Sequence, residues 1–178
     1  MTSLSDMQLL VVDDNQQMRH LLRCLLRAVG VFRITEAETA AEALDAMRER
    51  QIDLVILDWK MAPVDGLAFA RRLRWSEDSP NPFVPILMLT AHTEASRVAA
   101  ARDAGVTGFV KKPISARLLF ERITFALTDT RLFVRAPGFF GPDRRRFNDP
   151  GYAGPFRRST DAQAPEELVD LEDIRIRA

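Results

Sequence analysis

The feature that most constrains the fold is an alternation of short apolar runs with stretches of helical periodicity. Leu54-Val55-Ile56-Leu57 and the almost wholly apolar segment 85–90 are typical of parallel strands that are buried on both faces. Three further runs, near 7–12, 32–36 and 109–110, make five, and each is followed by residues with the three-to-four spacing of a helix. This order predicts an α/β domain in which a parallel sheet has helices on both faces.

Capping residues and breakers set the expected helix boundaries. Asn15 and Ser115 stand where a side-chain oxygen can cap a helix, and Gly30 stands where a left-handed residue can end one. The periodic pattern stops after Leu127. We therefore expect one packed domain over residues 6–128, and a tail over 129–178 without a folded domain of its own.

Polar residues follow the strands at their carboxyl ends, where parallel sheets bind ligands. They are Asp13 and Asp14 after the first strand, Asp58 after the third, Thr90 after the fourth and Lys112 after the fifth. An aspartate after a strand is often only a turn former or a helix cap, so Asp58 by itself identifies no site. The shared edge of the sheet is what makes these residues one candidate site.

Three carboxylates in one pocket need a cation, because each like-charge pair at ~4 Å costs roughly 4 kcal/mol at an effective dielectric near 20. A few hard oxygen ligands with room for water suit Mg²⁺ better than zinc. Lys112 can pair with a phosphate oxygen, Pro113 restricts the backbone beside it and is a candidate for a cis bond, and Thr90 offers a hydroxyl. The residues therefore predict phosphoryl transfer onto the carboxylate of Asp58.

This ordered set, Asp13-Asp14, Asp58, Thr90-Ala91 and Lys112-Pro113, resembles the receiver domain of two-component response regulators over about residues 6–128. The resemblance implies a flavodoxin-like, doubly wound sheet with strand order 2-1-3-4-5. It also implies that Asp58 accepts a phosphoryl group from a phosphohistidine of a sensor histidine kinase or a histidine phosphotransfer protein. The output would be changed contacts with a downstream protein, and the only chemistry would be Mg²⁺-dependent self-phosphorylation and autodephosphorylation at Asp58.

The resemblance also assigns roles by position. Asp14 would bind Mg²⁺ directly, Asp13 through water and Lys60 through its backbone carbonyl, with Asp58 completing the metal site. Thr90 and Lys112 would hold the phosphate, and Phe109 would be the aromatic residue that turns inward when Thr90 moves.

One departure concerns the loop after Asp58. The family usually has Met-Pro, whereas here Ala62 separates Met61 from Pro63, although the spacing from Asp58 to Gly66 is kept. An enzyme that uses an aspartyl intermediate shares the same carboxylate, metal and lysine logic. That class needs a cap segment and a second acid two residues after the nucleophile, where this chain has Lys60.

Composition adds little about partners. The 25 basic and 25 acidic residues cancel, so overall charge gives no argument for nucleic acid or a membrane. We expect a cytoplasmic protein without membrane insertion, because no long apolar span or signal peptide is seen. Cys24, surrounded by leucines, is expected to be a buried helical thiol.

The tail contains an internal repeat. Residues 138–145 recur thirteen residues later as 151–158, each copy with an aromatic residue, Gly-Pro and an arginine pair, Arg144-Arg145 and Arg157-Arg158. Three interpretations remain open: an arm that docks on a partner through these arginines, a plain flexible extension, and a basic arm over 131–160 that binds nucleic acid as the output. The acidic segment 166–177 has near-helical apolar spacing and is expected to form a short amphipathic helix.

Overall fold

The structure, a computed structural model, describes residues 4–91, 95–129, 131–143 and 167–169. Its centre is a five-stranded parallel sheet with the order β2-β1-β3-β4-β5. The strands are β1 (Gln8–Val12), β2 (Arg33–Ala37), β3 (Leu54–Asp58), β4 (Ile86–Thr90) and β5 (Gly108–Lys111). The predicted fold class and strand order are thus confirmed.

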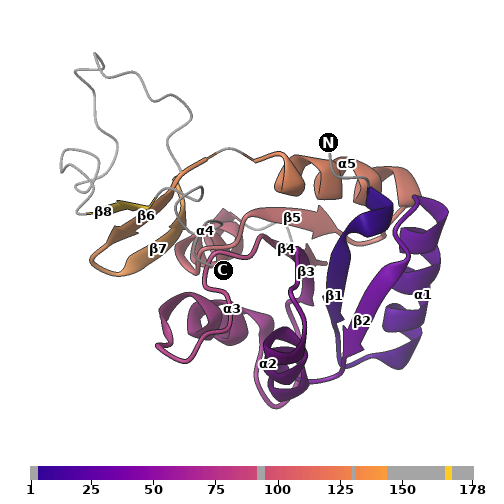
Figure 1. The fold of residues 1–178 in the computed structure, drawn as a ribbon, viewed down its shortest axis with the longest axis horizontal. Helices are drawn as coiled ribbons and strands as arrows, with labels where there is room; N and C mark the ends of the chain where they lie inside the picture. The colour runs from indigo at the N-terminus through magenta and orange to yellow at the C-terminus, as the bar shows by residue number, and fades with distance from the viewer. Residues whose placement is uncertain (1–3, 92–94, 130, 144–166, 170–178) are drawn as a thin grey trace.

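The helices cover both faces of the sheet (Figure 1). They are α1 (Gln16–Ala28), α2 (Ala40–Glu49), α3 (Gly66–Trp75), α4 (Ala95–Asp103) and α5 (Ala116–Leu127), with a short 3₁₀ turn, η1, at Leu4–Asp6. Because successive side chains of a strand point to opposite faces, Leu9 and Val11 pack with α1 and α5, whereas Leu10 and Val12 pack with α2, α3 and α4. None of the helices in the described ranges is long and apolar enough to cross a membrane.

The predicted caps are confirmed. The side chain of Asn15 accepts hydrogen bonds from the N–H groups of Gln17 and Met18, and Ser115 accepts one from the N–H of Leu118. Gly30 has φ 90°, the left-handed conformation expected after a helix. The prediction for Cys24 is wrong: its thiol is exposed, because α1 turns Leu22 and Leu26 toward the sheet and leaves position 24 outside.

The packed structure does not stop at Leu127. Strands β6 (Phe133–Ala136) and β7 (Phe139–Pro142) form an antiparallel hairpin, and β8 (Glu167–Val169) pairs with the other edge of β6. The expected helix over 166–177 is wrong at 167–169, where the chain is extended because it pairs with β6. The hairpin was not predicted.

Aromatic side chains attach the hairpin to the domain. Phe140 is fully buried and makes edge-on contacts with Trp75 of α3, with Phe83 and with Phe133, with ring centroids 6.1, 5.4 and 5.9 Å apart. In Figure 1 the hairpin lies beside α4, away from the central sheet. It packs against segments that precede β4 and β5, so it occupies the end of the sheet opposite to the predicted site.

Candidate functional site

Two buried carboxylates converge on one lysine at the carboxyl end of the sheet. Asp58 is the last residue of β3, and Asp13 follows the neighbouring strand β1. The Nζ of Lys112 lies 2.7 Å from Oδ1 of Asp58 and 3.8 Å from Oδ2 of Asp13. The structure therefore brings together three of the residues that the sequence placed at this edge.

Asp13 carries the least well compensated charge of these groups. Its side chain is 1% exposed, and Oδ1 accepts a hydrogen bond of 2.9 Å from the N–H of Asn15. Oδ2 is buried and has no hydrogen-bond partner among the described residues. Burial raises the pKa of Asp13, against the lowering effect of the Asn15 N–H, and the charge of Asp58 raises it further. A cation placed beside Oδ2 would relieve this cost.

Asp14 is exposed and is held by the loop between β3 and α3. Its Oδ2 accepts a hydrogen bond of 3.1 Å from the N–H of Ala62, and the Ala62–Pro63 peptide bond is cis. A proline at position 62 would have no N–H to donate. The departure noted in the sequence, Ala62 before Pro63, thus supplies the donor that orients Asp14.

The same loop passes very close to Asp58. The N–H of Gly66 donates to the carbonyl of Trp59 at 3.0 Å. A Cβ atom at Gly66 would lie 2.1 Å from the carbonyl oxygen of Asp58, so only glycine fits here. The backbone N–H of Lys60 donates to Oδ2 of Asp58 at 3.0 Å, whereas the Lys60 side chain is exposed.

Thr90 and Phe109 lie on the strands beyond Asp58. Thr90 ends β4 and is buried, and its carbonyl accepts the N–H of Lys112 at 2.9 Å. The Lys112–Pro113 bond is cis, as the sequence suggested. Phe109 is half-buried on β5 opposite Met88 and packs against the core under α2, α3 and α4. Thr90 thus ends β4 and Lys112 directly follows the adjacent strand β5, on which Phe109 lies.

The structure does not test the arginine pairs of the tail. Arg144, Arg145, Arg157 and Arg158 lie outside the described residues, so their role stays a prediction. Arg19 contacts the site but was not predicted from the sequence: its Nη1 donates to the carbonyl of Asp13 at 2.7 Å, and its guanidinium pairs with Glu36 and Glu38. Nothing in the sequence distinguishes Arg19 from the other arginines of the chain.

The donor set fits Mg²⁺. In the part of the chain that the structure describes, no three acidic, histidine or cysteine side chains form a ready metal cage. Mg²⁺ does not require one, because it is usually bound through one or two carboxylates and keeps several waters. Asp13, whose Oδ2 accepts no hydrogen bond from the described residues, can supply such a carboxylate, with Asp58 nearby and Asp14 at the rim.

The chain resembles known proteins over this same region. The family model for the response regulator receiver domain matches residues 9–124. Chemotaxis protein CheY of Pseudomonas aeruginosa is 34% identical over 117 residues, 66% of this chain and 93% of that protein. Chemotaxis protein CheY-3 of Vibrio cholerae is 32% identical over 118 residues, 66% of this chain and 89% of that protein.

Solved structures of response regulators have the same fold as this chain. A putative response regulator from Chloroflexus aurantiacus has a TM-score of 0.62 at 30% identity, covering 68% of this chain and 97% of that one. The chemotaxis protein CheY4 of Vibrio cholerae has a TM-score of 0.62 at 27% identity, covering 68% of this chain and 98% of that one. With the family model matching residues 9–124, the chain belongs to the response regulator receiver domain family.

Proposed function

We propose that this receiver is a phosphoacceptor switch, in which Asp58 takes a phosphoryl group from a phosphohistidine. The observation that carries the proposal is the position of Lys112 Nζ, 2.7 Å from Asp58 Oδ1 and 3.8 Å from Asp13 Oδ2, an oxygen that accepts no hydrogen bond from the described residues. An ammonium in this place can pair with a phosphate oxygen as charge develops during transfer. A buried carboxylate between a lysine and a candidate metal site is suited to nucleophilic attack on phosphorus.

The step exchanges one bond to phosphorus for another. An oxygen of Asp58 forms the new O–P bond, and the N–P bond to the imidazole of the donor breaks. The imidazole nitrogen keeps the electron pair of that bond and takes up a proton. Thr90 and Lys112 would hold the phosphoryl oxygens, and hydrolysis by water would later return the free carboxylate.

Asp13, Asp14, Asp58 and the backbone carbonyl of Lys60 would hold Mg²⁺. When bound, the metal neutralises negative charge on the carboxylates and the phosphoryl oxygens. A receiver domain of a sensor histidine kinase from Pseudomonas aeruginosa, 23% identical over 68% of this chain with a TM-score of 0.60, has been solved with a magnesium ion in its active-site cleft. That neighbour shares the fold, and the donor set described above is what favours the same ion here.

The partners we propose are a sensor histidine kinase or a histidine phosphotransfer protein upstream, and a protein that reads the altered surface downstream. Phe109 and Thr90 would carry the change from the phosphate to that surface. The chemistry would act only on the protein itself, through phosphorylation and dephosphorylation of Asp58. Nothing in the described residues supports the nucleic-acid alternative for the tail, whose arginine pairs lie outside those residues.

The test is incubation with acetyl phosphate and Mg²⁺, followed by intact-mass analysis. We expect the wild type to gain one phosphoryl group and Asp58→Asn to gain none. Asp45→Asn, which alters an exposed aspartate of α2, is the matched control and should behave as the wild type does. Label that persists on Asp58→Asn, or that never forms on the wild type, would refute the proposed role of Asp58.

A further inference from the structure

A buried arginine lies under the hairpin. Arg74, at the end of α3, is 1% exposed and donates four hydrogen bonds to backbone carbonyls: two to Gly105, at 3.1 and 3.0 Å, and one each to Pro82, at 2.6 Å, and Val84, at 2.8 Å. Its guanidinium lies 5.1 Å from the ring centroid of Phe133 on β6. Burial lowers the pKa of Arg74 to about 9, so the group is still charged at neutral pH.

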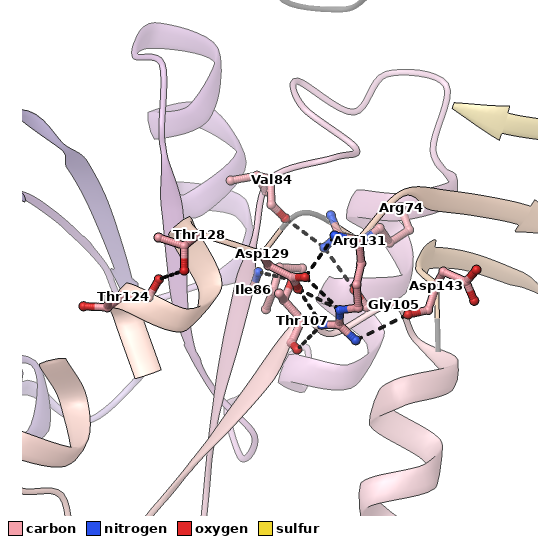
Figure 2. A network of polar contacts seen from close by, with 10 residues as sticks. All are labelled: Arg74, Val84, Ile86, Gly105, Thr107, Thr124, Thr128, Asp129, Arg131 and Asp143. Atoms are coloured by element: carbon pink, nitrogen blue, oxygen red, sulfur yellow. Dashed lines mark hydrogen bonds and ion pairs between the residues drawn. The ribbon is translucent and has the colours of Figure 1, made fainter. Parts of the chain in front are cut away.

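A second arginine joins the two ends of the hairpin to the sheet (Figure 2). Arg131 pairs with Asp129 at 2.5 Å, and its Nη2 donates to the carbonyl of Thr107 at 3.1 Å. Its Nη1 reaches the carbonyl of Asp143, just after β7, at 3.5 Å. The residues 131–143 together with Arg74 are called the latch below.

The latch also touches the domain backbone to backbone. A Cβ atom at Gly141 would lie 2.6 Å from the Cα of Gly105, and one at Gly105 would lie 2.3 Å from the carbonyl oxygen of Phe140. Gly105 has φ 79°, so two independent reasons require glycine there. The hairpin and the Gly105 backbone therefore lie in direct contact, with no room for a side chain at Gly105 or Gly141.

The segment that the latch holds leads directly to the phosphoacceptor site. The N–H of Gly105 donates to Arg102 and that of Val106 to Ala101, which joins the segment to the end of α4. Thr107 and Ile86 exchange hydrogen bonds of 3.0 Å at the beginning of β4 and β5. β4 ends at Thr90, a candidate phosphate ligand, and β5 ends at Lys111, next to the candidate ligand Lys112.

We propose that the latch is an inhibitory element coupled to phosphorylation of Asp58, an inference that rests on the proposed function. In this arrangement Lys112 pairs with Asp58, and Arg74 and Arg131 of the closed latch donate to the carbonyls of Gly105 and Thr107. A shift of Gly105 or Thr107 away from this arrangement would weaken the hydrogen bonds that Arg74 and Arg131 donate to their carbonyls, and it would alter the close backbone contact of Gly105 with the hairpin. A closed latch thus stabilises the unphosphorylated arrangement, and phosphorylation weakens the latch by the same factor, since coupling between sites is reciprocal.

The two tryptophans allow both ends of the coupling to be followed. Trp59 is adjacent to Asp58 in the chain, whereas Trp75 contacts Phe140 of the latch. Trp59→Phe leaves Trp75 as the reporter of the latch, and Trp75→Phe leaves Trp59 as the reporter of the site. The ligand for the titrations is beryllofluoride with Mg²⁺, a phosphoryl mimic that binds reversibly.

In Trp59→Phe we expect the mimic to change the emission of Trp75, and the additional change Asp58→Asn to abolish that response. Phe140→Ala and Arg131→Ala, made in the Trp75→Phe background, should bind the mimic at least about fivefold more tightly than that background, the lower end of typical couplings. Arg71→Ala, on the exposed face of α3, is the control and should leave affinity unchanged.

Each other outcome counts against a defined claim. If Trp59 reports binding of the mimic but the emission of Trp75 does not change, the coupling of the latch to Asp58 is refuted and the proposed function stands. Unchanged affinity of the Phe140→Ala and Arg131→Ala variants for the mimic would lead to the same conclusion. No binding of the mimic to Trp75→Phe and no acyl-phosphate labelling would overturn the proposed function, and the latch with it. If Phe140→Ala and Arg131→Ala fail to fold, as judged by circular dichroism, the Trp75 response in Trp59→Phe decides alone.

Discussion

Asp13→Asn should stabilise the metal-free protein, although it removes a residue of the candidate site. The carboxylate of Asp13 is buried, and Oδ2 has no hydrogen-bond partner in the described part of the chain. Asparagine keeps an oxygen that can accept the Asn15 N–H, and it carries no charge. The substitution therefore removes the cost of the buried charge, together with the attraction between Oδ2 and the ammonium of Lys112.

The size of the effect follows from the surroundings of Oδ2. An unsatisfied buried acceptor costs ~1–3 kcal/mol, more when it is charged. Repulsion from Asp58 adds to this cost, and Lys112, 3.8 Å away, offsets part of it. We expect the free energy of unfolding to rise by about 2 kcal/mol, which is roughly 5 °C in Tm for a chain of this size.

The gain in stability from Asp13→Asn should depend on pH. The pKa of Asp13 is raised in the folded state, so the folded protein favours the protonated carboxyl. The contribution of this group to the free energy of unfolding is therefore fully present below its ordinary pKa of 3.8 and is lost as pH rises through its pKa in the folded state. The gain from Asp13→Asn should thus be absent at strongly acidic pH, appear above that range and stay constant at neutral pH. Thermal melts in EDTA across this range measure it.

Magnesium supplies the second half of the test. Mg²⁺ should raise the Tm of the wild type, because it binds the folded carboxylates, and should raise that of Asp13→Asn much less. Asp45→Asn, exposed on α2, controls for loss of a surface charge. A lower Tm of Asp13→Asn than of the wild type in EDTA at neutral pH would refute the argument that Asp13 is held at a cost.

Three other substitutions test the site and the latch. Phe140→Ala should lower the opening free energy of the hairpin by ~3–5 kcal/mol, whereas the control Phe120→Ala, at a side chain 43% exposed on α5, should lower it by much less. Amide exchange of β6 measures both effects, and unchanged protection in Phe140→Ala would contradict the packing described. Gly66→Ala should displace the loop beside Asp58 and lower both Tm and phosphorylation, whereas Gly30→Ala, with open space around it, should cost only about 1 kcal/mol in thermal melts. Lys112→Ala should slow labelling by acetyl phosphate roughly 100-fold, and the exposed Lys111→Ala should not; equal rates would exclude Lys112 from the chemistry.

The sheet and the site residues were predictable because each rests on strong local patterns. Continuous apolar runs identify buried parallel strands, and the carboxyl ends of such strands meet at one edge. Asp13, Asp58, Thr90 and Lys112 could therefore be grouped before their distances were known. That Oδ2 of Asp13 accepts no hydrogen bond from the described residues was not predictable, because this depends on where Asn15 and Lys112 direct their donors.

The hairpin had a local signal that the composition of the tail obscured. Pro137-Gly138 lies between Phe133-Val134-Arg135-Ala136 and Phe139-Phe140, and a Pro-Gly pair between apolar segments is typical of a turn between strands. The abundance of glycine, proline and arginine after residue 128 favoured an unstructured tail. The hairpin packs because Phe83 and Trp75, distant in sequence, complete its aromatic cluster.

Arg74 explains why such a hairpin can act as a latch. A hairpin that covered only apolar side chains would expose them to water whenever it opened, at ~25 cal/mol for each Å². Beneath this one lie the guanidinium of Arg74 and the carbonyls of Pro82, Val84 and Gly105 to which it donates, and water can hydrogen-bond to all of these groups. Opening returns a desolvated charge to solvent, and this gain offsets part of the aromatic contact that is lost. The free energy of opening the hairpin is therefore smaller than its buried apolar area alone would suggest.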